Sequence, residues 1–227
     1  MTQKEINIID FFRNNDLPIE LVSEGGTFND FYKNHKIRFT GEFYSFDMNS
    51  YAPEIAKYKG NVYYHGYWIN MHWFQNIRDQ IIYELTFPEF DDDYNKEMAE
   101  KMCTGRSVGV HIRRGDFLTL GWGLDSKWYQ QSVDHMKLVI SNPVFYIFSD
   151  DPAWCLSNLG TLGFNTKKDN VVFVEGNTGG KNWRDMQLMT LCKNLIIANS
   201  SFSYLAALLN QNPNKYVLNP LPFRQIV

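Results

Sequence analysis

Cysteine is scarce in this sequence, and neither a long apolar run nor the pattern of a secretory leader is evident. The three cysteines, Cys103, Cys155 and Cys192, are an odd number without CxxC spacing, which argues against a disulfide scaffold and a structural zinc site. The N-terminus is polar from its second residue and lacks a leader pattern. No apolar run approaches the roughly 18 residues that a membrane span needs. We therefore expect a cytoplasmic protein that associates at most peripherally with a membrane.

An excess of charge of one sign is also missing. The 22 lysines and arginines are balanced by 25 aspartates and glutamates, for a formal net charge of −3. Such a chain has no global field that attracts nucleic acid, so we expect no nucleic-acid partner and only a local site for an anion. The motifs GxxxxGK[ST], GxGxxG, GxSxG and HExxH do not occur, which argues against P-loop kinases, typical NAD enzymes, α/β-hydrolases and zincins.

What the sequence does contain is an alternation of apolar segments that changes character near residue 100. The 227 residues, 44% of them hydrophobic, suffice for one substantial core. Strands that alternate with helices of about ten residues are typical of a parallel sheet covered on both faces. We therefore predict a doubly wound α/β domain over residues 101–227, preceded by a separate region over 1–100. The expected elements are strands over 37–44, 61–69, 107–114, 144–150, 171–174, 195–198 and 216–218, helices over 73–85, 93–102, 127–138, 152–156, 183–192 and 202–209, and a loop over 115–126.

Polar clusters follow three of these strands, at 111–116, 149–151 and 199–203. Parallel strands end at the same edge of a sheet, and open α/β sheets bind ligands there, so the three clusters should converge on one crevice. Alternation along the strand places His111 and Arg113 on the same side.

Arg113 is our candidate for phosphate binding, because a guanidinium is a planar fork of donors that keeps its charge at physiological pH. The alternative for Arg113 or Arg114 is an ion pair with a carboxylate that holds strands and loops together, and we prefer that alternative for Arg114. The candidate partners of such a pair are Asp116, Asp150 and Asp185.

Two further groups could bind a nucleotide. Ser201 and Ser203, with the backbone amides at the start of the helix over 202–209, would form an anion cradle, although Ser200 or Ser201 could also simply cap that helix. Asp185 could accept the adjacent N1–H and N2–H₂ groups of guanine. It could equally be an acidic residue favoured by the dipole in the first turn of its helix.

The segments VGVHIRRGDF, FYIFSDDP and WRDMQLMTLCKNLIIANSSFSYLAALL together resemble glycosyltransferase family 11, the α1,2-fucosyltransferases. The HxRRGD motif is shared with the α1,6- and protein O-fucosyltransferases, whereas the IIANSSFS segment is more specific. The resemblance covers roughly residues 60–220. It implies a GT-B-like architecture with GDP-fucose bound by the domain over 101–227 and a reduced acceptor-side region over 1–100.

The resemblance also implies roles for individual residues. Arg113 would contact the β-phosphate and stabilise the charge on the leaving diphosphate. His111 and Asp185 would contact the guanosine, and Ser201, Phe202 and Ser203 would line the nucleotide pocket. Asp116 is the nearest strand-end carboxylate to serve as catalytic base, with structural pairing to Arg114 as its alternative.

The family implies an inverting, metal-independent transfer of L-fucose from GDP-fucose to a galactose-terminated glycan, with no cofactor. The run Asp91-Asp92-Asp93 has the D-x-D spacing of metal-dependent glycosyltransferases, but no apolar strand leads into it, so we favour a helix start there. The strand and GGLGNQ-type loop with which family members normally begin have no counterpart here. The alternative to an active enzyme is therefore a truncated, non-catalytic relative that binds GDP or a glycan.

Overall fold

The computed structural model describes residues 74–220. The chain divides into two compact units, Met1–Thr86 and Phe87–Val227. Within the first unit the structure describes α3 (Arg78–Glu84), which lies inside the helix predicted over 73–85. The strands predicted over 37–44 and 61–69 lie outside the described residues.

The second unit contains a five-stranded parallel sheet with the order β3-β2-β1-β4-β5. All five strands were predicted from their valine, isoleucine and aromatic content, and the sheet confirms the α/β class. Their bounds are β1 (Ser107–Ile112), β2 (Val144–Ser149), β3 (Asn170–Phe173), β4 (Asn194–Ile196) and β5 (Val217–Leu218).

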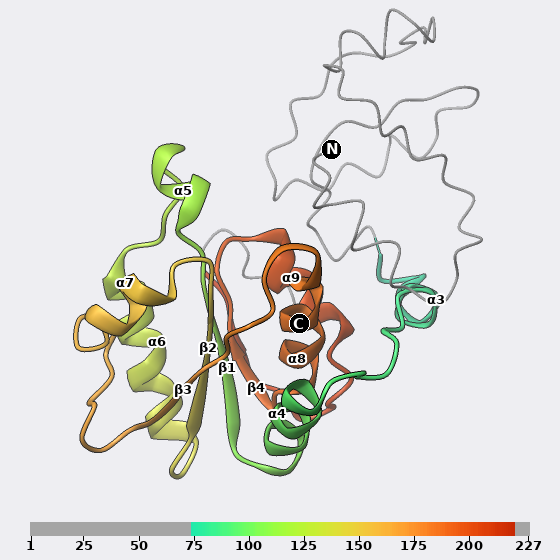
Figure 1. The fold of residues 1–227 in the computed structure, drawn as a ribbon, viewed down its shortest axis with the longest axis horizontal. Coiled ribbons are helices and arrows are strands. Elements are labelled where there is room, and N and C mark those ends of the chain that lie inside the picture. The colour runs from blue at the N-terminus through green and yellow to red at the C-terminus, as the bar shows by residue number, and fades with distance from the viewer. Residues whose placement is uncertain (1–73, 221–227) are drawn as a thin grey trace, which may run out of the picture. The chain divides into compact units, whose positions relative to one another are not determined.

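Helices cover both faces of the sheet, as a doubly wound fold requires (Figure 1). On one face lie α6 (Ser126–Val139) and α7 (Pro152–Ser157). On the other lie α4 (Asp93–Thr104), α8 (Trp183–Leu191) and α9 (Ser201–Leu209). A short 3₁₀ helix, η3, spans Gly179–Lys181.

One predicted loop is partly helical. We expected residues 115–126 to form a loop, but the structure places α5 (Gly115–Thr119) directly after β1. This five-residue helix projects beyond the sheet in Figure 1, and it is too short to carry an apolar face with helical periodicity.

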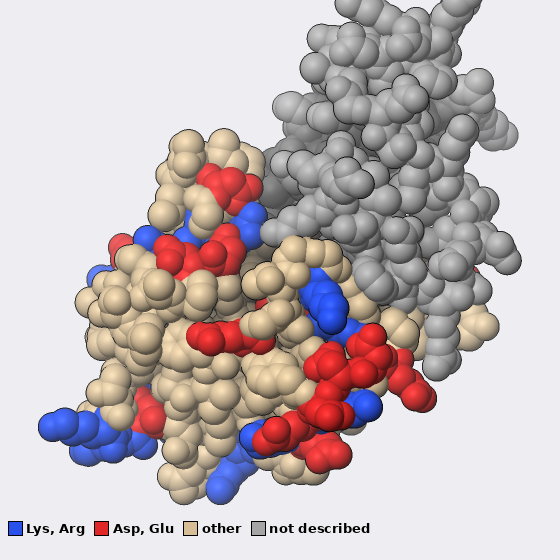
Figure 2. Space-filling model, in the orientation of Figure 1, with Lys and Arg blue, Asp and Glu red and all other residues tan. Residues whose placement is uncertain are grey.

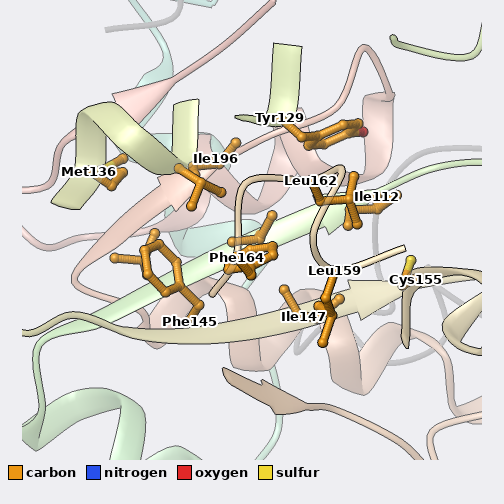
Figure 3. Packing of buried hydrophobic residues seen from close by; sticks show 13 residues of the cluster. Ile112, Tyr129, Met136, Phe145, Ile147, Cys155, Leu159, Leu162, Phe164 and Ile196 are labelled. Atoms are coloured by element: carbon orange, nitrogen blue, oxygen red, sulfur yellow. The ribbon is translucent and has the colours of Figure 1, made fainter. Parts of the chain in front are cut away.

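The side chains of β1 alternate between the two faces. Val108, Val110 and Ile112 belong to the core under α6 and α7, which Figure 3 shows from close by. Gly109 points to the opposite face, where an added Cβ would lie 2.9 Å from Leu195 Cδ2. His111 also faces that side and contacts α9. The strand is therefore buried throughout and presents its last polar side chain to the α9 face.

All three cysteines are free thiols in this structure. Cys155 and Cys192 are buried free thiols and Cys103 is an exposed one. Burial raises the pKa of the Cys192 thiol, which keeps it protonated at neutral pH. No helix in the described part of the chain is long and apolar enough to cross a membrane.

The strand order reverses beside β1. The chain runs outward from β1 through β2 to β3, and then crosses back to place β4 on the other side of β1. In open parallel sheets, ligands bind beyond the carboxyl ends of the two strands that flank such a reversal. The relevant edge here is formed by the residues after Ile112 and after Ile196.

Candidate functional site

Arg113 follows β1 and is held by two carboxylates. Its Nη2 atom lies 2.6 Å from Asp116 Oδ1, and its Nη1 atom lies 2.9 Å from Asp150 Oδ2. The guanidinium also sits over the Phe117 ring, 5.3 Å from its centroid. The two carboxylates differ in exposure, because the side chain of Asp150 is 23% exposed and that of Asp116 is 59% exposed. Asp150 thus holds the arginine from the protein side, and Asp116 from the solvent side.

Arg114 forms an ion pair, as predicted, but its partner is Asp151 and not one of the three predicted carboxylates, Asp116, Asp150 and Asp185. Its Nε atom lies 3.1 Å from Asp151 Oδ2, and its guanidinium stacks 3.4 Å from the centroid of the Trp154 ring on α7. The predicted pairing of Asp116 with Arg114 is wrong: Asp116 pairs with Arg113. Arginine 114 turns to the α7 face because it alternates with Arg113 along the chain.

The turn after β1 is packed tightly against the end of β2. The backbone N–H of Arg114 donates to Asp150 Oδ1 at 2.9 Å, and Ser149 Oγ donates to the carbonyl of Ile112 at 2.8 Å. A Cβ atom added to Gly115 would lie 2.6 Å from Asp150 Oδ2. The clusters at 111–116 and 149–151 therefore meet, as predicted, and the glycine lets them approach. In Figure 2, basic and acidic side chains lie together at the base of the lobe formed by α5.

His111 is a neutral, buried imidazole. Its side chain packs against Phe202 of α9 with the ring centroids 5.4 Å apart, and its residue is 6% exposed. Burial, and then the charge of Arg113, lowers the pKa of His111 to about 3. Its Nδ1 atom is buried without a hydrogen-bond partner among the described residues. Such a histidine can form one hydrogen bond with a ligand, but it is too weakly basic to serve as a general base at neutral pH.

The start of α9 completes this edge of the sheet. Ser200 occupies the N-cap position, but its side chain makes no capping hydrogen bond, so the proposed capping alternative is wrong for this hydroxyl. The first amides of an α-helix have no acceptor within the helix and can bind an anion. Asn199 Nδ2 donates to the carbonyl of Trp122 at 2.8 Å, which ties this turn to the loop that follows α5.

The predicted pocket residues of α9 lie in different environments. Ser201 is exposed at the first helical position, and Phe202 is half-buried against His111. Ser203 is fully buried, and its hydroxyl lies 3.3 Å from each of two carbonyl oxygens, those of Ala198 and Ser200. Ser203 therefore shapes the turn from β4 into α9, whereas the side chain of Ser201 is exposed.

Asp185 lies in the first turn of α8 and forms part of a second group. Burial raises its pKa to about 7, and a hydrogen bond from Asn177 partly opposes that rise. Asn177 in turn pairs with Asn95 of α4. Our sequence reasoning missed both asparagines. Asn177 follows a predicted strand, as other site residues do, and this position is the one signal that could have found it. No sequence pattern links it to Asn95, which lies 82 positions away.

The acidic run before α4 starts a helix, as predicted. The carboxylate of Asp92 accepts a hydrogen bond from the backbone N–H of Asn95 at 2.8 Å, and Asp91 pairs with Arg184 of α8 at 2.6 Å. Acidic side chains gather over α4 in Figure 2. Among residues 74–220, no group of three or more His, Cys, Asp or Glu side chains is arranged to hold a metal ion.

Comparison with known proteins supplies a family. The family model of glycosyl transferase family 11 matches residues 27–223. Alpha-1,2-colitosyltransferase of Escherichia coli is 33% identical over 185 residues, 78% of this chain and 62% of that protein. Galactoside alpha-(1,2)-fucosyltransferase 2 of Gorilla gorilla gorilla is 27% identical over 192 residues, 77% of this chain and 53% of that protein. The chain thus spans between half and two thirds of the length of these two relatives.

Among solved structures, the fucosyltransferase NodZ from Bradyrhizobium matches with a TM-score of 0.38 and 22% identity. The match covers 51% of this chain and 39% of that one.

Proposed function

The chain belongs to glycosyl transferase family 11, and we propose that it transfers L-fucose from GDP-fucose to a terminal galactose of a glycan, forming an α1,2 linkage with inversion. The observation that carries the proposal is the placement of Arg113. It lies at the end of β1, directly beside the strand-order reversal, where an open parallel sheet binds its ligand. The uncapped start of α9 follows the other strand that flanks this reversal, so a diphosphate could meet a guanidinium and helix amides together.

In this proposal Arg113 and α9 bind the diphosphate. As the bond between fucose C1 and the β-phosphate oxygen breaks, negative charge grows on that oxygen. A guanidinium fixed by Asp150 stabilises the charge without moving, which lowers the barrier. The amides at Ser201 and Phe202 add partial positive charge from the helix dipole.

The acceptor hydroxyl attacks C1 from the face opposite the diphosphate and gives its proton to a base. We propose Asp116 as this base, because it is the exposed carboxylate beside Arg113. The diphosphate would compete with Asp116 for the Nη2 atom of the arginine. Binding of the donor therefore frees the carboxylate at the stage when the acceptor needs a proton acceptor.

We propose that Asp185 and His111 recognise the guanosine. A carboxylate can accept two parallel hydrogen bonds, which the N1–H and N2–H₂ groups of guanine offer and adenine does not. His111 has a buried Nδ1 atom that can take part in one further hydrogen bond. The proposed reaction needs no resident metal or cofactor, since Arg113 and the helix amides carry the charge stabilisation.

Two alternatives remain distinct from this proposal. The sugar could be colitose, which the name of the E. coli relative specifies for that protein. The chain could instead bind GDP or a glycan without catalysis. We propose that the reaction takes place in the cytoplasm, and the three free thiols support this compartment. The acceptor would be a surface glycan, and contact with the membrane would be at most peripheral.

The test is a transfer assay with GDP-fucose and a β-galactoside, in which mass spectrometry detects the product and NMR identifies its linkage. We expect Arg113→Ala to lower kcat by about 10²- to 10³-fold, as is typical of removing one group that stabilises developing charge. Arg106→Ala is the matched control, because this exposed arginine lies at the opposite end of β1. Its activity should equal that of the wild type.

The same assay separates the alternatives. Turnover of GDP-colitose but not of GDP-fucose would show that the transferred sugar is colitose and not fucose. Thermal stabilisation by GDP without any transfer would support the non-catalytic alternative. Loss of transfer in EDTA would contradict metal independence. Absence of a fucosylated product from the wild type would overturn the proposed function.

A further inference from the structure

Two buried asparagines form a hydrogen-bonded pair that ends at Asp185. Asn95 lies in the first turn of α4, and Asn177 lies between β3 and η3; they are 2% and 7% exposed. Asn95 Nδ2 donates to Asn177 Oδ1, and Asn177 Nδ2 donates to Asn95 Oδ1, both at 2.9 Å. Asn177 Nδ2 also donates to Asp185 Oδ1 at 2.9 Å. The pair therefore connects α4 to the carboxylate at the start of α8.

Every amide hydrogen of this pair has an acceptor. An asparagine nitrogen carries two hydrogens, and those of Asn177 go to Asn95 and Asp185. Those of Asn95 go to Asn177 and to Asp92 Oδ2, the latter at 2.8 Å. Rotating either amide by 180° would place its oxygen against a carboxylate and break the reciprocal bonds. The carboxylates of Asp92 and Asp185 thus fix the orientation of both side-chain amides.

The segment that carries Asn177 is itself fixed to α4. The Tyr94 hydroxyl accepts a hydrogen bond from the backbone N–H of Glu175 at 3.0 Å. Gly176 has a φ of +88°, a left-handed conformation that a glycine adopts without strain, and it turns the chain just before Asn177. Asp92 accepts from the backbone of Asn95 as the cap of α4, so the far end of the network is also anchored.

We propose that Asn177, held by Asn95, is the positioning residue that aims the carboxylate of Asp185 at the guanine base. The proposal rests on the proposed function, in which Asp185 reads guanine. It adds that the nucleotide preference of the site depends on α4, an element that precedes the sheet.

The physical reason is that bidentate recognition needs a carboxylate in one plane with the base and in its ionised form. The Asn177 amide limits rotation of that carboxylate by holding one of its oxygens. It also favours the ionised form, because the hydrogen bond lowers a pKa that burial has raised. A protonated carboxyl offers a donor at one oxygen and cannot accept from both N1–H and N2–H₂.

The test measures nucleotide discrimination by calorimetry on the full chain. Inosine diphosphate lacks the 2-amino group of guanine, so the ratio of its Kd to that of GDP reports the second hydrogen bond to Asp185. We expect Asn177→Ala to lower this ratio about tenfold, the size of one hydrogen bond to a charged group. Asn95→Ala should lower it in the same direction, although Asn95 itself does not contact Asp185.

A matched control separates positioning from folding. Asn210 is another buried asparagine, and its Nδ2 atom donates to the carbonyl of Cys192 at 2.8 Å. Asn210→Ala should lower the melting temperature but leave the ratio of the two dissociation constants unchanged. If Asn177→Ala does not fold, Asn95→Ala gives the same comparison.

The pH profile is a readout that a structural role would not move. The diphosphate ionises alike in both ligands, so its titration cancels in the ratio. We expect the wild-type ratio to fall as the pH drops through about 7 and its midpoint to move upward in Asn177→Ala. Tyr94 and Glu175 also lie within electrostatic range of this network, and neighbouring Arg184 is paired with Asp91.

The outcomes distinguish the two proposals. If the wild type does not bind GDP, the proposed function fails, and this inference fails with it. If the wild type prefers GDP but folded Asn177→Ala and Asn95→Ala keep its ratio and its midpoint, only the positioning role is overturned.

Discussion

Replacing Asp185 with asparagine should stabilise the protein at high pH. Burial raises the pKa of this carboxyl from 3.8 to about 7. Between these values the unfolded chain is ionised while the folded protein holds the proton, so the contribution of Asp185 to stability is greatest below pH 4 and is lost as the pH rises through 7. A shift of about 3 pKa units corresponds to about 4 kcal/mol, which is the most that a neutral isostere could recover at pH 8.

The assay is urea unfolding of the wild type and Asp185→Asn at pH 8 and pH 4.5. The variant should be more stable by up to about 4 kcal/mol at pH 8 and by only about 1 kcal/mol at pH 4.5. Asp134→Asn is the control, because this exposed carboxylate on α6 should give a difference of a few tenths of a kcal/mol at both pH values. An equal effect of Asp185→Asn at the two pH values would refute the reasoning.

Three further predictions concern Arg113 and the residues that hold it. Asp116→Asn should tighten GDP binding by about two- to fivefold, because it removes an exposed ion pair that competes with the diphosphate. Asp150→Asn should instead weaken GDP binding by about tenfold, because the partly buried carboxylate holds the arginine in place. Calorimetry would check both, and effects of the same sign would contradict the different roles. Gly115→Ala should also weaken GDP binding and lower the melting temperature, because the Cβ of the new alanine would displace the Asp150 carboxylate. An unchanged GDP affinity in this variant would show that the contact is not needed.

Local patterns predict most of the second unit. The strand predicted over 107–114 is evident from its β-branched residues, although β1 ends at Ile112, and its alternation correctly separates His111 from Ile112. The start of α4 follows from the acidic run, because a carboxylate at the N-cap satisfies a free amide. Strand alternation and helix capping depend on residues that are close together along the chain, so a sequence pattern can reveal them.

Features set by tertiary packing were not predictable in this way. Helix α5 is too short to have a periodic apolar face, so only its position after β1 defines it. The partner of Asp116 depends on how Arg113 turns over the end of β2 toward Asp150. The amide pair of Asn95 and Asn177 requires α4 and the segment after β3 to meet, and no residue spacing encodes that meeting.

The charges around Arg113 also bear on how a donor would bind. Arg113 and Arg114 face three carboxylates, those of Asp116, Asp150 and Asp151, so the cluster is not basic as a whole. A diphosphate that approaches from solvent therefore meets no net positive field from these side chains. In the proposed mechanism the first attraction would come from the amides at the start of α9, and the contact with Arg113 would form when the diphosphate displaces Asp116. If the donor binds as proposed, its affinity would depend on the exchange of Asp116 for the diphosphate at a guanidinium that Asp150 holds, so Asp116 would set donor affinity as well as act as the candidate base.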